Sequence, residues 1–176
     1  MNDKELALLV VDDDADTTKM LSQLLGLTLT RQHHCFTAAS VEEATRLLDS
    51  TFFHLVITDI NMPGPTGISL CRQIYENHPN TVVIIMSAMT DINYAIDALR
   101  AGAFDYLVKP IHAAPLTAAI ERALEYQESL MKRHYCQQSL EEEVRDLFAL
   151  NARVRSSRSR KAAGERLRTD AARNKR

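Results

Sequence analysis

Short apolar runs, each closed by a polar residue, recur along the chain. The runs LALLVV, LVIT, VVIIM and FDYLV are rich in β-branched residues. Continuous apolar runs of this length are typical of parallel strands that are buried on both faces. The segment HHCFT is a fifth, more polar candidate. We therefore predict strands at residues 6–11, 33–37, 54–58, 81–87 and 104–108.

The segments between these runs carry apolar residues at helical spacing. Helices are expected over 15–28, from Ser40, from Thr66 to His78, over 92–99 and from Pro115 onward. Ser40 and Glu43 fit a capping box, and Asp14 or Asp16 can cap the first helix. Strand and helix alternate five times. The sequence therefore predicts an α/β fold of three layers, a doubly wound five-stranded parallel sheet with right-handed crossovers.

Composition is that of a globular protein, with 45% hydrophobic and 25% charged residues. No apolar run approaches the roughly 18 residues that are needed to span a bilayer. The N-terminus, MNDKELALLV, lacks the pattern of a signal peptide. The three cysteines, Cys35, Cys71 and Cys136, do not have metal-ligand spacing. We expect a cytoplasmic protein that makes no membrane contact.

Charge is distributed unevenly along the chain. Residues 1–150 hold 11 basic and 21 acidic residues, a net charge of −10, whereas 151–176 hold 10 basic and 2 acidic, a net charge of +8. The helical pattern that begins at Pro115 continues without Pro or Gly to about Leu150. We predict three parts: a domain at 1–126, a helical or coiled-coil extension at 127–150, and a basic tail at 151–176 that is disordered.

Chemically useful side chains stand at the ends of the predicted strands. Asp12 and Asp13 follow the first strand, and Asp59 follows the third. Ser87 ends the fourth strand and Lys109 follows the fifth. The carboxyl ends of parallel strands meet at one edge of a sheet, where ligands bind. Neighbouring carboxylates there need a cation, Mg²⁺ prefers such oxygen ligands, and a lysine can meet a phosphoryl oxygen. The sequence therefore predicts phosphoryl chemistry.

Four segments in this order resemble the receiver domain of two-component response regulators. They are VVDDD at 10–14, TDINMPGPTG at 58–67, MSA at 86–88 and GAFDYLVKP at 102–110. The resemblance covers roughly residues 5 to 126. It implies a CheY-like, flavodoxin-like fold with strand order 2-1-3-4-5. It also implies that the chain receives a phosphoryl group and switches its partner interactions in a phosphorelay.

The resemblance assigns a role to each site residue. Asp59 is the expected phosphoacceptor, and Ser87 and Lys109 are expected to meet the phosphoryl oxygens. Asp13 resembles the direct Mg²⁺ ligand, Asp12 the weaker or water-mediated one, and the main-chain carbonyl of Asn61 completes the protein ligands together with Asp59. Tyr106 resembles the aromatic switch that turns inward once Ser87 moves. The family also implies a cis Lys109-Pro110 bond, and places Asn61 and Met89 where side chains tune the phosphate lifetime.

Each of these assignments has a plainer alternative. Asp59 can be a capping aspartate, Ser87 a strand serine and Tyr106 a core aromatic. A haloacid-dehalogenase-type phosphatase also has an aspartate nucleophile after a strand, but it needs a second aspartate two positions later, where this chain has Asn61. A regulator that binds nucleic acid through the basic tail is a third reading, although the tail has no motif for specific readout. A dinucleotide-binding domain is excluded because no G-x-G-x-x-G follows the first strand.

A sensor histidine kinase or a phosphotransfer protein is the expected phosphoryl donor, because no histidine here resembles a phosphorylated kinase histidine. A homodimer is expected through the face of the fourth helix, fifth strand and fifth helix, or through the C-terminal helix, where Leu140, Val144 and Leu147 form a partial seam. RHYCQQSLEEEVRDLF weakly resembles linkers to HD-GYP output domains. Neither an HD nor a GYP motif is present, so we expect no output enzyme in this chain beyond its own phosphorylation and dephosphorylation.

Overall fold

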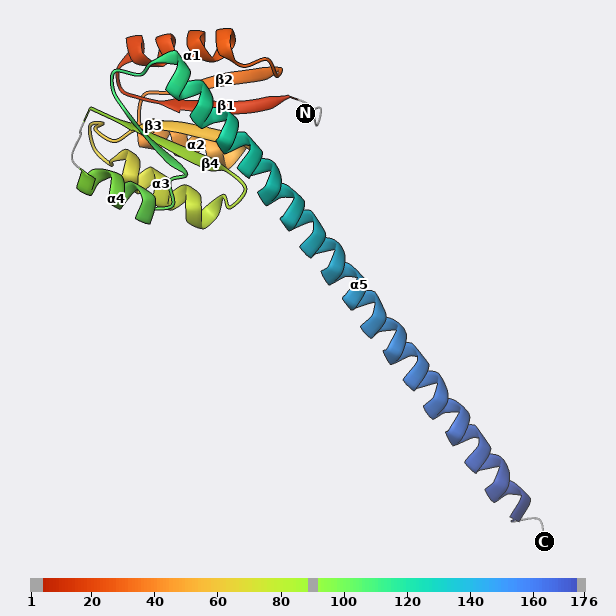
Figure 1. Ribbon diagram of the computed structural model, residues 1–176. Helices are drawn as coiled ribbons and strands as arrows, with labels where there is room; N and C mark the ends of the chain where they lie inside the picture. Colours follow the sequence, from red (N-terminus) through yellow and green to blue (C-terminus); the bar gives the residue numbers. More distant parts are fainter. Residues whose placement is uncertain (1–4, 89–91, 174–176) are drawn as a thin grey trace. The chain divides into compact units, whose positions relative to one another are not determined.

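One parallel sheet of five strands forms the centre of the protein. The computed structural model describes residues 5–88 and 92–173, with side chains up to residue 149. The strands are β1 (Leu6–Val11), β2 (His33–Ala38), β3 (Leu55–Asp59), β4 (Val82–Ser87) and β5 (Asp105–Val108). All neighbouring strands are parallel and their order is β2-β1-β3-β4-β5 (Figure 1). Both the predicted fold class and the strand order are confirmed.

Five helices alternate with the strands. They are α1 (Ala15–Thr28), α2 (Val41–Ser50), α3 (Gly67–Asn77), α4 (Ile92–Arg100) and α5 (Ala113–Arg173). Polar caps fix where the first three begin: Asp14 accepts from the Asp16 N–H, Ser40 from the Glu43 N–H, and Thr66 from the Ser69 N–H. The carboxylate of Glu43 returns to the Ala39 N–H at 2.9 Å, one residue before the position expected in a capping box.

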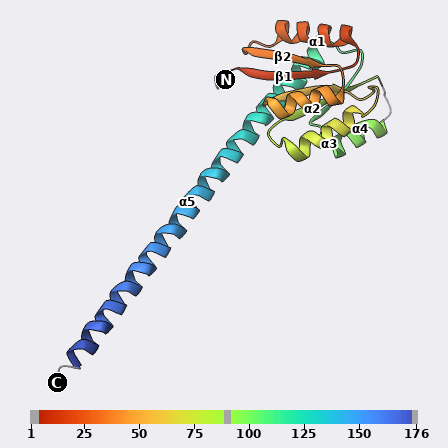
Figure 2. The same cartoon turned by 180° about the vertical axis from the view of Figure 1, so that it is seen from behind.

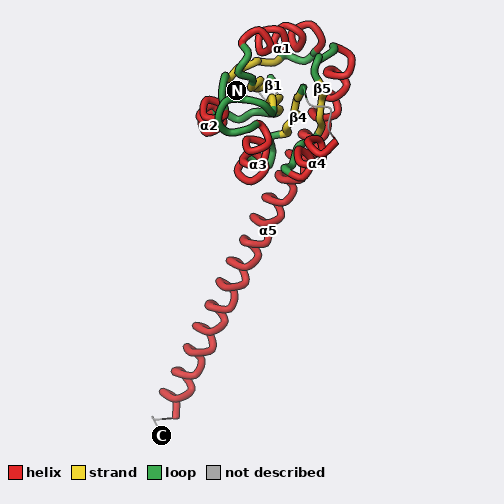
Figure 3. The backbone as a smooth tube through the Cα atoms, turned by 90° about the vertical axis from the view of Figure 1, so that its left-hand side faces the viewer, coloured by secondary structure: helices red, strands yellow, loops and turns green. Residues whose placement is uncertain are grey.

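The helices cover both faces of the sheet and bury two separate layers of core. Leu8 and Ile57 point into the layer shared with α1 and α5, where Leu21 and Ile120 are also buried. Their strand neighbours point into the other layer, beneath α2, α3 and α4. Figure 2 views these layers from behind, and Figure 3 shows the strands at the centre with helices around them. Such two-sided burial explains why the central strands are continuously apolar in sequence.

The last helix belongs to two compact units of the chain. The first unit comprises Met1–Met131, and the second Lys132–Arg176. In the first, Leu116, Ala119, Ile120, Ala123 and Leu124 of α5 are buried against the sheet. In the part of the chain that the structure describes, no helix is long and apolar enough to cross a membrane.

The last helix extends beyond the end predicted for the helical extension. That extension was predicted to end at residue 150, and α5 is helical up to Arg173. The tail is rich in Ala, Arg, Lys and Glu, contains no Pro and has a single glycine, Gly164. These residue types favour helix, and nothing in the tail ends one. The exact division of the chain into three parts stays a prediction.

Candidate functional site

Backbone hydrogen bonds hold the carboxyl ends of the strands in register at one edge of the sheet. The Asp12 N–H donates to the Ala38 carbonyl at 3.1 Å, and the Lys109 N–H donates to the Ser87 carbonyl at 2.8 Å. Beside them, the Ile60 N–H donates to the Met86 carbonyl at 3.0 Å. These bonds extend the pairing one residue beyond the strands. The first residues after β1, β3 and β5 therefore have fixed positions.

Three carboxylates meet at this edge. One oxygen from each of Asp12, Asp13 and Asp59 lies within 4.8 Å of the other two. Asp12 and Asp59 are buried, whereas Asp13 is exposed to solvent. Like charges at this separation repel one another, and burial of two of them strengthens the repulsion. The geometry therefore favours a bound cation, and the prediction that these residues come together is confirmed.

Lys109 reaches into the same cluster from β5. Its Nζ lies 2.8 Å from Asp12 Oδ2 and 3.3 Å from Asp59 Oδ2. The Lys109-Pro110 peptide bond is cis, as the family resemblance implied. Burial alone would lower the pKa of Lys109, but the hydrogen bonds and charges of Asp12 and Asp59 outweigh it and raise that pKa. The ammonium group therefore stays charged between the two buried carboxylates.

The two buried carboxylates have different hydrogen-bond partners. Asp12 uses both oxygens: Oδ1 accepts from the Asp14 N–H at 3.0 Å, and Oδ2 accepts from Lys109. Asp59 presents Oδ2 to Lys109, but no described residue donates a hydrogen bond to its buried Oδ1. Burial raises the pKa of Asp59, the charge of Asp12 adds to this rise, and Lys109 opposes it. Asp59 Oδ1 is thus an acceptor held ready for a ligand.

Two residues for which the sequence suggested no role hold the backbone of Asp59. Gly67, the first residue of α3, lies so close to Asp59 that a Cβ at this position would be 1.9 Å from its carbonyl oxygen. The Gly67 N–H also donates to the Ile60 carbonyl at 3.1 Å. The buried Thr58 hydroxyl also donates to the Asp59 carbonyl, at 3.1 Å. A glycine at a helix start was the one sequence signal available for this close approach.

The remaining predicted site residues lie around this cluster. Ser87 is buried at the end of β4, and Tyr106 is half-buried in β5 against the core beneath α2, α3 and α4. Asn61 is exposed in the loop that follows Asp59. Met89 lies outside the described residues. The structure therefore places Ser87 and Tyr106 on the neighbouring strands β4 and β5, and their role as a switch stays a prediction.

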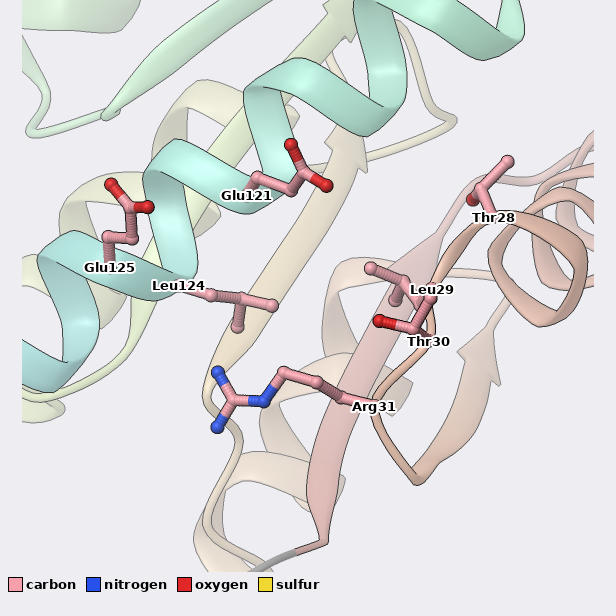
Figure 4. A pocket seen from close by; sticks show the side chains of 7 residues that line it. All are labelled: Thr28, Leu29, Thr30, Arg31, Glu121, Leu124 and Glu125. Atoms are coloured by element: carbon pink, nitrogen blue, oxygen red, sulfur yellow. The ribbon is translucent and has the colours of Figure 1, made fainter.

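A separate cavity of about 380 Å³ lies between the α1–β2 loop and α5. Its lining, shown in Figure 4, consists of Thr28, Leu29, Thr30, Arg31, Glu121, Leu124 and Glu125. The guanidinium of Arg31 points toward α5 and its Nη1 lies 2.7 Å from Glu128 Oε1. None of the clustered aspartates lines this cavity. We assign it no part in phosphoryl chemistry, but the ion pair is one of the contacts that fix α5.

Residues 8–121 match the family described as response regulator receiver domain. The chain belongs to this family. A receiver accepts a phosphoryl group in two-component signal transduction, and this receiver carries the acidic cluster on the edge of the sheet where that chemistry takes place. The match favours the receiver over the phosphatase that the sequence alone left open.

Two curated relatives illustrate the similarity of this receiver. Over 127 residues it is 39% identical to the DNA-binding transcriptional regulator NtrC of Escherichia coli (strain K12). This match covers 71% of the present chain and 26% of NtrC. Over 117 residues it is 38% identical to the response regulator protein PilR of Pseudomonas aeruginosa, covering 66% and 25% respectively. The chain thus spans about a quarter of the length of these relatives.

Solved structures of receivers are similar as well. The signal receiver domain of an HD domain-containing protein from Pseudomonas fluorescens Pf-5 has a TM-score of 0.68 and 29% identity, covering 76% of this chain and 96% of that one. TrrA from Thermotoga maritima, in complex with Mg²⁺ and BeF, has a TM-score of 0.61 and 28% identity, and the match covers 68% of this chain and 99% of that one. The beryllofluoride-activated NtrC4 receiver domain dimer has a TM-score of 0.64 and 30% identity, and the match covers 69% of this chain and 98% of that one.

Proposed function

We propose that Asp59 is the residue of this receiver that accepts the phosphoryl group. The observation that carries the proposal is the contrast between the two buried carboxylates. Both oxygens of Asp12 are hydrogen-bonded, whereas Oδ1 of Asp59 is buried without a described donor. A nucleophile needs a free lone pair facing the ligand, and of the two buried carboxylates only Asp59 has an oxygen without a described donor. Lys109 holds the other oxygen and so fixes the direction in which Oδ1 points.

The proposed reaction is a transfer between two proteins. Oδ1 of Asp59 attacks the phosphorus of a phosphohistidine in line, the P–N bond breaks, and the histidine leaves with its electron pair. The product is an acyl phosphate on Asp59. A sensor histidine kinase or a phosphotransfer protein supplies the phosphohistidine. Such a transfer needs positioning and charge neutralisation more than acid–base chemistry, and the cluster supplies both.

Mg²⁺ is the cation that we propose for the cluster. The carboxylates of Asp12, Asp13 and Asp59 supply hard oxygen ligands within 4.8 Å of one another, and this clustering of like charges supports the fit. The main-chain carbonyl of Asn61 would add a further oxygen. When bound, the ion neutralises the negative charge of carboxylates and phosphoryl oxygens. TrrA, a similar receiver, is a complex with Mg²⁺ and BeF.

Lys109, Ser87 and Tyr106 are proposed to respond to the new phosphoryl group. Its oxygens offer a strong acceptor to Lys109 Nζ, which now lies between Asp12 and Asp59. The hydroxyl of Ser87, at the end of the adjacent strand, is the second donor within this edge. Movement of Ser87 would leave room on its side of the sheet for the ring of Tyr106. The chemical event thereby becomes a change in the packing of β5.

The surface of α4 and β5 is the proposed contact for partners. Apolar side chains are exposed there: Ile92 at 70%, Leu99 at 54% and Val108 at 45% of their surface. Exposed apolar residues gathered on neighbouring elements mark interaction sites. This face supports a homodimer of receivers, and the similar NtrC4 receiver is a dimer. An output domain is a second proposed partner, since the matched segment covers only 26% and 25% of the two relatives.

The phosphoacceptor assignment is tested by labelling with acetyl phosphate in the presence of Mg²⁺. We expect one phosphoryl group per chain, and we expect Asp59→Asn to abolish labelling because the amide is not a nucleophile. EDTA should abolish labelling of the wild type. Asp97→Asn, which changes an exposed carboxylate on α4, is the matched control and should label normally. Undiminished labelling of Asp59→Asn would refute the assignment.

A further inference from the structure

Two direct contacts join the start of β5, with the residue before it, to the N-terminal part of α5. Arg122 Nη2 lies 2.6 Å from Asp105 Oδ2, and the rings of Phe104 and Tyr126 stack with centroids 5.1 Å apart and planes at 27°. Arg122 and Tyr126 are four residues apart, so they lie on one face of α5. We call these four residues the β5–α5 clamp. It ties two successive residues of the chain to two successive turns of one helix.

Asp105 is shared between the clamp and the switch residue. While its Oδ2 binds Arg122, its Oδ1 accepts a hydrogen bond from the Tyr106 N–H at 2.8 Å. One rigid carboxylate therefore connects the backbone of Tyr106 to the guanidinium on α5. A displacement of the Tyr106 backbone changes the position of Asp105, and Arg122 is the first group on α5 that has to respond.

Contacts on other sides of α5 connect it to elements that do not contain the switch residues. The side chain of Gln127 is 2% exposed, and its Nε2 donates to the Asn80 carbonyl, before β4, at 3.3 Å. Glu128 pairs with Arg31 of the α1–β2 loop at 2.7 Å. These contacts hold the helix against a fixed part of the domain. A shift of the clamp relative to them would turn or tilt α5 instead of moving the whole domain.

We infer that the β5–α5 clamp is the element that passes the state of Asp59 to α5, through Tyr106, Asp105 and Arg122. The inference rests on the proposed function, because it needs β5 to repack when Asp59 is modified. Arg122 and Asp105 are partly exposed, and ion pairs in such surroundings contribute little to folding stability. The pair can therefore be removed without unfolding the domain. Its value lies in coupling two elements that must move together.

The test uses amide NMR of the full chain with Mg²⁺ and beryllofluoride, which binds a carboxylate as a phosphoryl group does. In the wild type we expect shifts around Asp59 and along residues 117–128. The α5 shifts should fall to about half or less of the wild-type values in Arg122→Gln and, separately, in Asp105→Asn. The asparagine keeps an oxygen that can accept the hydrogen bond from the Tyr106 N–H. Shifts around Asp59 should remain. Arg122→Lys keeps the charge and should restore part of the α5 response.

Arg31→Gln is the matched control, because it removes the other ion pair of α5, of similar length and exposure. The bond from Gln127 to the Asn80 carbonyl still holds α5 in this variant, so the α5 response should remain. Wild-type α5 shifts in both Arg122→Gln and Asp105→Asn would overturn the inference, and so would an equal loss in Arg31→Gln. Beryllofluoride that shifts nothing around Asp59 in the wild type would instead refute the proposed function. Unchanged far-UV circular dichroism shows that each variant folds, and Tyr126→Leu tests the clamp again if one does not.

Discussion

Asp12 and Asp59 show how two buried carboxylates of one cluster acquire different roles. Asp12 is satisfied by a backbone N–H and by Lys109, whereas Asp59 pairs with Lys109 through Oδ2 and has no described donor at Oδ1. Burial raises the pKa of Asp59, and the cation proposed for the cluster would favour its ionised form. The difference between the two residues comes from one turn of backbone after β1, which directs the Asp14 N–H at Asp12.

Gly67 provides a prediction at the residue scale. Gly67→Ala should lower the free energy of unfolding by about 1–3 kcal/mol, because the new Cβ would meet the backbone carbonyl of Asp59, which cannot move aside cheaply. Acetyl phosphate labelling should also slow, since the Asp59 backbone would shift. Chemical denaturation measures the first effect.

Gly26 is the matched control for this experiment. It lies inside α1 with no atom within 4 Å of a Cβ built on it. Gly26→Ala should raise the free energy of unfolding by about 0.5–1 kcal/mol, because alanine favours helix. If both substitutions changed stability in the same direction, the close contact between Gly67 and Asp59 would not be the cause.

Sequence reasoning predicted which residues form the site but not how they contact one another. The positions of Asp12, Asp59 and Lys109 followed from their places after apolar runs, since parallel strands end at a common edge. The sequence does not show that Lys109 bridges both aspartates or that one oxygen of Asp59 stays free, because these contacts depend on tenths of an ångström. Thr58 and Gly67 were missed because they contact a backbone carbonyl group, which no pattern of side chains reveals.

At the scale of elements, strand and helix limits were predicted well where polar residues mark them. β3 was expected at 54–58 and lies at Leu55–Asp59, and α1 was expected at 15–28 and occupies Ala15–Thr28. The helical extension was predicted to end at residue 150, short of Arg173, because the basic tail was judged by its charge and its lack of a core pattern. Charge and low hydrophobicity argue against packing, but they do not argue against helix when helix-forming residues prevail.

His54, just before β3, gives a pH prediction for the connection between β1 and β3. Its Nδ1 accepts a hydrogen bond from the Ala7 N–H at 3.0 Å, which requires that nitrogen to be unprotonated. Burial lowers the pKa of His54 below the ordinary 6.5. The unfolded chain therefore takes up the proton first. Stability is fully present above about pH 6.5 and falls as the pH is lowered further.

Urea denaturation between about pH 7.5 and about pH 5.5 measures this effect. His54→Gln keeps a hydrogen-bonding side chain that does not titrate, so the fall in unfolding free energy across this interval should be smaller than in the wild type. The same pH dependence in wild type and variant would contradict the assignment to His54.

At the scale of the whole molecule, the extension carries an unpaired apolar seam. Leu140, Val144 and Leu147 are 61%, 43% and 56% exposed, and their spacing of four and three residues fits a two-helix contact. Burying three such side chains contributes roughly 1.5–3 kcal/mol each, which is of the same order as the cost of association. We predict a weak dimer whose population rises with protein concentration and with beryllofluoride.

Sedimentation of the full chain against a version ending at Glu128 tests this prediction. The shorter version retains the buried face of α5 from Leu116 to Leu124 and lacks the seam. We expect the full chain to self-associate at tens of micromolar and the shorter version to do so less. Leu140→Gln with Leu147→Gln in the full chain should behave like the shorter version. Monomers throughout, with and without beryllofluoride, would rule out the seam as an interface.

Because α5 runs unbroken from Ala113 to Arg173, its length determines both the distance it spans and the direction in which its later residues face. Each added residue advances a helix by about 1.5 Å and rotates everything beyond it by about 100°. Insertion of one residue would therefore turn the later residues of α5 to a different side, whereas seven or eleven residues restore their facing to within about 20°. Length variation that preserves a face of this helix should therefore favour insertions of seven or eleven residues. A flexible tether would impose no such rule.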